Sequence, residues 1–149
     1  MQLDWILKNF EQLSPAELYA IFHLRNEVFV IEQNCIYQDA DNKDQVSLHL
    51  CGWAGADLVA YTRIIPPGVS YEACSIGRVV TSPAHRKSGV GTELMQVSIE
   101  KAFSIFNTDT IKIGAQVYLK KFYTSLGFVS CSDEYLEDGI PHITMLLRK

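Results

Sequence analysis

The sequence has no long apolar run, although 48% of its 149 residues are hydrophobic. No stretch approaches the ~18 consecutive apolar residues of a membrane-spanning helix. The first residues also lack the basic segment, followed by an apolar segment, that marks a secretory signal. We therefore expect no membrane partner, and we expect a soluble, cytoplasmic protein.

Cysteine is scarce, and the four cysteines form no Cys-x-x-Cys pair. This spacing argues against a zinc site, and the absence of a secretory signal argues against disulfides. The polar segment 38–45 holds three aspartates, but it fails the calcium-loop template because Asp44 and Leu50 stand where glycine and glutamate are needed. We expect a solvated acidic loop there and no metal.

An excess of positive charge is also missing. Thirteen lysines and arginines stand against seventeen aspartates and glutamates, a net charge of −4. Nucleic acid selects for basic surfaces, so we expect no nucleic-acid partner. The length fits one domain, 1–149, and the 20% of charged residues fits a globular chain.

Hydrophobic periodicity predicts an α/β chain. Ser14-Pro-Ala-Glu17 is a capping box that opens a helix to about Val30. Expected strands are 3–7, 46–53, 58–65, 74–81, 110–115, 128–131 and 143–147, and further helices are 90–106 and a short one near 119–126. Strand 46–53 alternates as if half-buried. This order predicts a mixed sheet with helices on both faces and a parallel crossover from Cys74 to Ala115.

One stretch points to a ligand. Arg86-Lys-Ser-Gly-Val-Gly91 follows the 74–81 strand and leads directly into a helix. The bare N–H groups of a helix that begins on glycines favour an anion, and two cations lie beside them. The spacing matches neither a P-loop nor a dinucleotide fingerprint. A phosphate-bearing ligand is expected, although a plain turn with two surface cations is the alternative.

These residues resemble the Gln/Arg-x-x-Gly-x-Gly/Ala signature of the GNAT acyltransferases. Phe122-Tyr-Thr-Ser-Leu-Gly-Phe128 resembles a second segment of that family, and Arg25–Gln33 and Glu137–His142 resemble its ElaA-like branch. The resemblance implies a single-domain GNAT-like fold, mostly antiparallel, with a splayed central parallel strand pair. It also implies acetyl-CoA as acetyl donor and no metal.

The resemblance further implies which residues hold the coenzyme. The exposed edge of the 74–81 strand would pair with the pantetheine arm, and the glycine-rich loop would hold the diphosphate. The implied cofactor-binding residues are Val79, Val80, Thr81, Arg86, Lys87, Ser88, Gly89, Val90, Gly91, Thr92 and Phe122.

Acetyl transfer to an amine needs an oxyanion donor, an acid for the leaving thiolate and a route for the amine proton. The resemblance gives the first role to a backbone N–H of Val79 or Val80 and the second to Tyr123, which also fits a plain core tyrosine. Candidates for the base are Glu32 and His49, with water as a third option. Asp41, Asp44, Glu137 and Asp138 are either an acidic rim for a cationic substrate or solvated charges.

Two functions remain open from the sequence. The first is an acetyl-CoA-dependent N-acetyltransferase that acts on an amine of a small molecule or peptide. The second is a non-catalytic module that binds acyl-CoA as a sensor. A homodimer through the final strand near Ile143 is possible in either case.

Overall fold

The computed structural model describes residues 2–86 and 88–149, so the predicted coenzyme residue Lys87 lies outside the described residues. The first half of the chain builds an antiparallel sheet in the order β1-β2-β3-β4. Its strands are β1 (Asp4–Asn9), β2 (Leu48–Ala54), β3 (Asp57–Ile65) and β4 (Ser75–Thr81).

The second half builds another antiparallel sheet around the last strand. β8 (Ile140–Arg148) lies between β5 (Thr110–Gln116) and β6 (Val129–Ser130), and it also pairs with the short β7 (Tyr135–Glu137). β7 lies between the expected strands 128–131 and 143–147, where no strand is predicted from the sequence. The tight turn at Asp138 and Gly139, both with positive φ, folds β7 back on β8.

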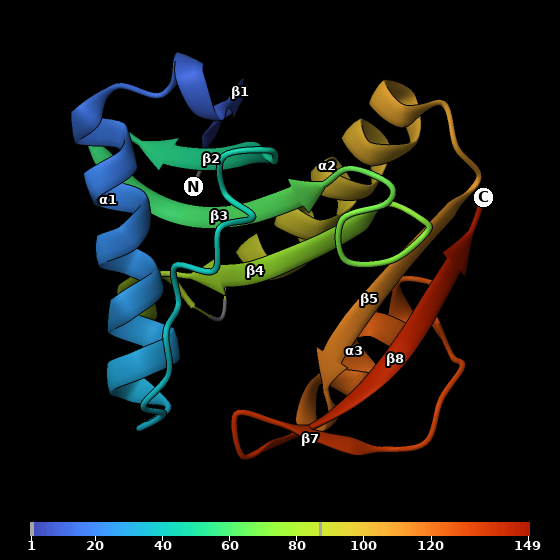
Figure 1. The fold of residues 1–149 in the computed structure, drawn as a ribbon. Helices are drawn as coiled ribbons and strands as arrows, with labels where there is room; N and C mark the ends of the chain where they lie inside the picture. Colours follow the sequence, from blue (N-terminus) through green and yellow to red (C-terminus); the bar gives the residue numbers. More distant parts are fainter. Residues whose placement is uncertain (1, 87) are drawn as a thin grey trace.

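The two sheets meet at one place in the part of the chain that the structure describes. Cys74, just before β4, forms a parallel bridge with Ile111 of β5, and the Lys112 N–H donates to the Cys74 carbonyl at 3.0 Å. From there β4 and β5 diverge, so that their carboxyl ends lie apart (Figure 1). The predicted α/β fold with a splayed parallel pair is therefore confirmed.

Helices cover both faces of the first sheet (Figure 1). α1 (Pro15–Arg25) and the π-helix η2 (Asn26–Glu32) lie on one face, and α2 (Val90–Phe106) lies on the other. α3 (Lys120–Ser125) covers the second sheet. Short 3₁₀ turns are η1 (Phe10–Gln12), η3 (Pro83–His85) and η4 (Val117–Leu119). None of the helices among the described residues is long and apolar enough to cross a bilayer.

These layers enclose two apolar cores. The larger core joins α2 and α3 to both sheets through residues such as Leu94, Ile111 and Phe128. The smaller core joins α1 and η2 to β2, β3 and β4 through Ile21 and Tyr61. Strand β2 is consequently buried on both faces, with His49, Leu50 and Cys51 all buried, and the half-buried strand that the sequence predicted is wrong.

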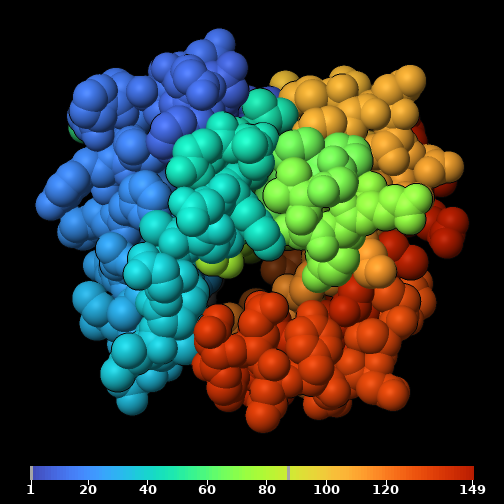
Figure 2. Space-filling model, in the orientation of Figure 1, coloured from blue at the N-terminus to red at the C-terminus, as the bar shows by residue number. Residues whose placement is uncertain are grey.

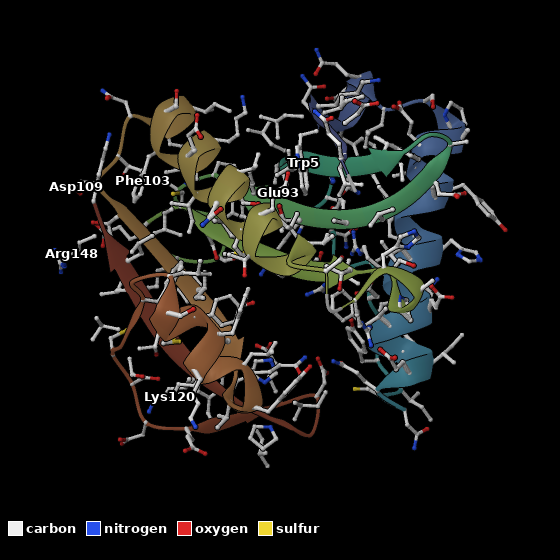
Figure 3. All side chains as sticks on the ribbon, turned by 180° about the vertical axis from the view of Figure 1, so that it is seen from behind. Trp5, Glu93, Phe103, Asp109, Lys120 and Arg148 are labelled. Atoms are coloured by element: carbon white, nitrogen blue, oxygen red, sulfur yellow. The ribbon has the colours of Figure 1, made fainter. Side chains whose placement is uncertain are left out.

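The back of the first sheet is fixed to α2 by a polar contact. The indole of Trp5 in β1 donates to a Glu93 carboxylate oxygen at 2.8 Å, and both side chains are seen in Figure 3. Gly52 of β2 lies under this indole, where a Cβ would come within 2.7 Å of the ring. This contact holds the start of α2 against the edge of the sheet.

The first helix begins as predicted but does not run on as one α-helix. The Ser14 hydroxyl oxygen caps it by accepting from the Glu17 N–H at 3.0 Å, and the Ser14 N–H donates to the Glu17 carboxylate at 2.8 Å. After Arg25 the winding widens to five residues per hydrogen bond, as in the bond from the Gln33 N–H to the Val28 carbonyl. π-helical segments of this kind occur often at functional sites.

Candidate active site

A β-bulge interrupts β4 just before its carboxyl end. Tyr61 of β3 pairs with Val80, whereas Arg63 pairs with Gly77, so two residues of β4 oppose one of β3. The first of the two, Arg78, has a φ of +50°. Bulges of this type re-aim the backbone next to active sites. Among the predicted coenzyme residues, Val79 and Thr81 are half-buried and Val80 is buried.

The glycine-rich loop forms the N-terminus of α2, as the sequence predicted. Gly89 is the N-cap with a φ of +77°, and no described atom lies within 4 Å of where its Cβ would be. The helix begins at Val90, and no side chain among residues 2–86 and 88–149 caps its first N–H groups. A Cβ on Gly91 would lie 3.9 Å from the Phe122 ring of α3. The bare helix end and the ring thus bound one site.

The polar residues of this loop are exposed. Ser88 donates from its hydroxyl to the His85 carbonyl at 2.8 Å, and Thr92 lies exposed in the first turn of α2. The Arg86 guanidinium forms a two-pronged ion pair with Glu32 at the end of η2, with N–O distances of 2.8 and 2.6 Å. The hydrogen bonds from Arg86 lower the pKa of the Glu32 carboxyl. Glu32 is therefore a weak candidate for the base.

The end of η2 crosses the gap between the diverging strands. Glu32 contacts the loop after β4, and the next residue, Gln33, exchanges side-chain amide hydrogen bonds of 3.3 Å with Gln116 at the end of β5. Cys35 follows, with its thiol 3.3 Å from the Asp138 carbonyl in the β7–β8 turn. Sequence reasoning missed Gln33 and Gln116, because nothing local to either residue marks a contact 83 positions away.

Tyr123 of α3 lies on the core side of the site. Its ring meets Phe122 and Phe128 edge to face, with centroid distances of 5.2 and 5.9 Å. Only 5% of the residue is exposed, and its hydroxyl has no hydrogen-bond partner among the described residues. Burial raises the pKa of this phenol. The hydroxyl is therefore protonated and available to a ligand.

His49 lies in the core of the first half, away from any opening. Its Nε2 is 2.9 Å from the Asp44 carbonyl, which can only accept, so Nε2 carries the proton and Nδ1 accepts from the Tyr61 hydroxyl at 2.7 Å. The residue is fully buried, and burial lowers its pKa. Both ring nitrogens are already bonded, so the structure argues against His49 as the base, and we do not retain that hypothesis.

The prediction of a solvated acidic loop at 38–45 is also wrong. Arg25 of α1 is fully buried and donates to Asp39 at 2.8 Å and to Asp44 at 2.7 Å. Arg63 of β3 donates to Asp44 at 3.0 Å and, with both terminal nitrogens, to Asp41 at 2.7 and 2.9 Å. Because these carboxylates neutralise buried arginines, Asp41 and Asp44 do not form a rim for a cationic substrate.

Arg78 completes this network from the bulge of β4. Its Nε forms an ion pair of 2.8 Å with Asp39, and its Nη2 contacts the Asp41 carboxylate at 3.2 Å. The Tyr37 hydroxyl donates at 2.6 Å to the same Asp39 oxygen, Oδ1, that Arg78 Nε contacts. Three arginines and three aspartates thus join α1, the segment 37–45, β3 and β4.

A hollow opens between three segments that are distant in the sequence. Figure 2 shows it bounded by the cyan segment after η2, the green β3–β4 loop and the orange-red β7–β8 hairpin. Tyr71 of that loop and Tyr135 of β7 both lie over Gly114 of β5, with their hydroxyls 3.1 Å from where a Cβ would be. His142 of β8 stacks on Tyr135 at 6.0 Å. The sequence analysis named His142 only within the Glu137–His142 segment, and it did not predict Tyr71, Gly114 or Tyr135 as site residues.

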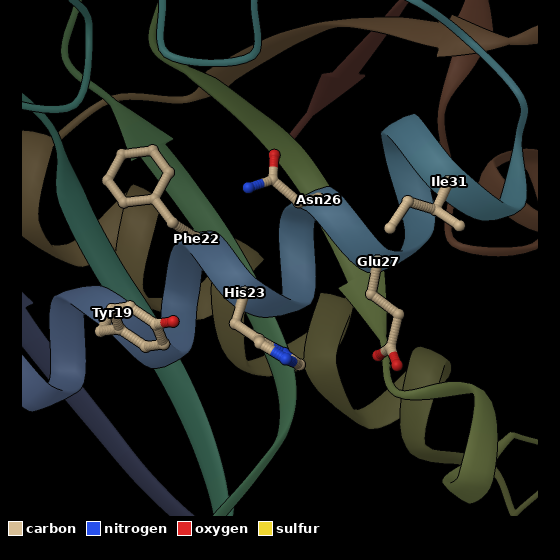
Figure 4. Close-up of a pocket in the computed structure, with 6 residues that line it drawn as sticks. All are labelled: Tyr19, Phe22, His23, Asn26, Glu27 and Ile31. Atoms are coloured by element: carbon tan, nitrogen blue, oxygen red, sulfur yellow. The ribbon is translucent and has the colours of Figure 1, made fainter.

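A hollow of about 310 Å³ on the outer face of α1 and η2 is lined by Tyr19, Phe22, His23, Asn26, Glu27 and Ile31 (Figure 4), none of which was predicted as a site residue. Within residues 2–86 and 88–149, no three histidines, cysteines, aspartates or glutamates are grouped so as to hold a metal ion.

Comparison with known proteins agrees with this geometry. Residues 11–149 match the family model described as an acetyltransferase (GNAT) domain. Protein ElaA of Escherichia coli is 41% identical over 145 residues, which cover 96% of this chain and 95% of that protein. An acyl-CoA N-acyltransferase from Pseudomonas aeruginosa is 40% identical, with a TM-score of 0.93 over 98% of this chain and 99% of the other.

A more distant structure shares the fold alone. A GNAT family acetyltransferase from Elizabethkingia anophelis, solved with acetyl-CoA bound, has a TM-score of 0.68 at 12% identity and covers 99% of each chain. The family match over most of the chain and the identity to ElaA decide the assignment. The chain is an acyltransferase and belongs to the GNAT family, in the branch that includes ElaA.

Proposed function

We propose that this acyltransferase moves the acetyl group of acetyl-CoA directly to an amine of a small molecule or peptide. The observation that carries the proposal is the bare N-terminus of α2 at Gly89, beside Arg86 and next to the gap between β4 and β5. Helix N–H groups and a guanidinium are complementary to a diphosphate. The acetyl-CoA complex of the same fold from Elizabethkingia anophelis supports this ligand.

The rest of the coenzyme would lie along β4. Its pantetheine amides would pair with the backbone of residues 79–81, which places the thioester at the bulge. There the N–H of Val79 or Val80 would stabilise the oxyanion as the amine attacks the carbonyl. The Tyr123 hydroxyl, which burial keeps protonated at rest, would then hydrogen-bond to the sulfur as the C–S bond breaks, pass its proton to the departing thiolate and regain a proton from water.

The amine proton is best carried away by water. His49 has no free nitrogen, and Glu32 is held by Arg86 with a lowered pKa. Water in the hollow of Figure 2 would take the proton, or the amine would enter neutral. A non-catalytic sensor is the weaker proposal, because it gives no use to the Tyr123 hydroxyl.

Calorimetry with acetyl-CoA and two variants tests the coenzyme site. Arg86→Glu puts a carboxylate beside the diphosphate, so binding should weaken roughly tenfold or more, as for loss of a charge-assisted contact. Glu32→Gln is the matched control, because it removes the partner of Arg86 but keeps the guanidinium. Its affinity should equal or exceed that of the natural protein. Absence of any heat from folded protein would overturn the proposal.

A further inference from the structure

The backbone conformation of Arg78 needs a cause. Its φ of +50° lies in the left-handed region, where the Cβ of an L-residue crowds the following carbonyl oxygen. Glycine and asparagine adopt this conformation most readily, and arginine has no such preference. A long charged residue at this position of the bulge therefore points to a role of its side chain.

The side chain is fixed by two aspartates of the segment that faces β4. Its Nε lies 2.8 Å from Asp39, and its Nη2 lies 3.2 Å from the Asp41 carboxylate and 3.1 Å from the Asp39 carbonyl. The guanidinium also lies 5.8 Å from the centre of the Tyr37 ring. Several contacts on one planar group leave it little freedom.

Each of the two aspartates is also bound by a second arginine. Arg25 binds Asp39, and Arg63 binds Asp41 through both carboxylate oxygens. Arg25, Arg63 and Asp39 are each at most 5% exposed, so water screens their interactions little. The network therefore offers Arg78 a rigid anchor.

We propose that Arg78 is a positioning residue for acyl transfer. Held by Asp39 and Asp41, it keeps the β4 bulge in the conformation that aims the Val79 and Val80 N–H groups at the acyl carbonyl. The inference rests on the proposed function, because the bulge matters only where an acyl group is bound. Arg78 acts through the backbone of β4, while the glycine-rich loop binds the diphosphate independently of it.

Hydrogen exchange of the folded protein with and without acetyl-CoA separates these two parts. In the natural protein, acetyl-CoA should slow exchange both in residues 79–81 and in the loop 88–91. Arg78→Gly keeps a residue that accepts positive φ but removes the anchor. It should retain protection in 88–91 and lose it in 79–81. Arg78→Lys keeps the charge without the planar fork and should be intermediate.

Kinetics on an amine found by thiol release gives the second readout. Arg78→Gly should lower kcat roughly tenfold or more, the scale of a displaced oxyanion donor, while the Kd for acetyl-CoA changes less than about threefold. Arg148→Gly, the same substitution at the exposed end of β8, should change neither quantity. Circular dichroism checks that each variant is folded.

The outcomes of these experiments distinguish the role of Arg78 from the presence of the coenzyme site. If Arg78→Gly protects residues 79–81 as the natural protein does, or keeps its kcat, the role of Arg78 is refuted while the coenzyme site stands. If acetyl-CoA protects neither 79–81 nor 88–91 in the natural protein, the proposed function is refuted, and with it the role of Arg78 that rests on it. Should Arg78→Gly be unfolded, Arg78→Lys decides, and full protection of 79–81 with unchanged kcat would refute the role.

Discussion

Tyr123 shows at the scale of one residue how a core position can carry chemistry. Its ring is packed between two phenylalanines, yet its hydroxyl has no partner within the described residues. Burial raises the pKa of the phenol, so the proton stays on the oxygen throughout the neutral range. An acid that is always protonated gives a catalytic contribution that does not change with pH there.

Removal of this hydroxyl should slow turnover without unfolding the protein. Tyr123→Phe keeps the packed ring, and kcat for thiol release should fall by about 10²-fold, the lower end for a general acid. The loss should be constant across neutral pH. Tyr118→Phe, at an exposed neighbour, is the control and should keep its rate. Equal rates for natural protein and Tyr123→Phe would remove the acid role.

Local signals made part of the site predictable. The Arg86–Gly91 turn and Tyr123 each lie in a short sequence motif that can be identified without knowledge of the fold. The partners of Arg25 and Arg63 carry no such signal, since Arg25 reaches Asp44 over 19 positions and Arg63 reaches back over 22 to Asp41. An aspartate-rich segment has the same sequence pattern whether water or buried arginines surround its carboxylates. The sequence therefore could not reveal these ion pairs, and the predicted solvated loop is wrong.

At the scale of elements, prediction succeeded where periodicity was strong. α2 has the predicted bounds, Val90 to Phe106, because its apolar residues recur at helical spacing and glycine precedes it. The widening of α1 into η2 was not predicted, because no residue type in Asn26–Glu32 specifies π-helical over α-helical winding. β7 was missed because three residues paired only to β8 are too few to show alternation.

Strand β5 carries a testable constraint at Gly114. A Cβ there would lie 3.1 Å from the hydroxyls of both Tyr71 and Tyr135, so Gly114→Ala should destabilise the fold by about 1 kcal/mol, the low end for overpacking, because Gly114 is exposed and both neighbours are side-chain ends. Gly91→Ala is the control, since its Cβ would meet Phe122 only at 3.9 Å and should not lower stability. Urea unfolding without ligand measures both.

A second substitution should relieve the crowding at Gly114. Tyr71→Phe removes one of the two crowding oxygens, so it should recover part of the stability lost in Gly114→Ala. If Gly114→Ala unfolds at the same urea concentration as the natural protein, the tyrosines do not cover β5 in solution as they do here.

At the scale of the whole molecule, the arginine–aspartate network joins elements that the chain connects only loosely. Arg63 lowers the pKa of Asp41 and Arg25 lowers the pKa of Asp44, in each case against the opposing effect of burial. Carboxyls with a lowered pKa in the folded state stabilise it above the unfolded pKa of ~3.9. That stabilisation is lost as the pH falls from there towards the folded pKa.

The free energy of unfolding should therefore drop steeply as the pH falls below about 4, the ordinary carboxyl range. Asp41→Asn leaves Arg63 without its two-pronged partner, so the variant should be less stable at neutral pH and should lose less on acidification. Asp57→Asn, at an exposed aspartate that begins β3, should follow the natural protein. Parallel acid profiles for Asp41→Asn and natural protein would contradict this account.

The bridge between Cys74 and Ile111 has a mechanical consequence. Within the described residues, β4 and β5 share no ladder beyond this pair, so the width of the opening at their far ends depends on the side-chain volumes at the bridge. Both residues are completely buried, so a bulkier side chain at either should change the width of the opening several residues away, where we propose that the acceptor and the thioester meet.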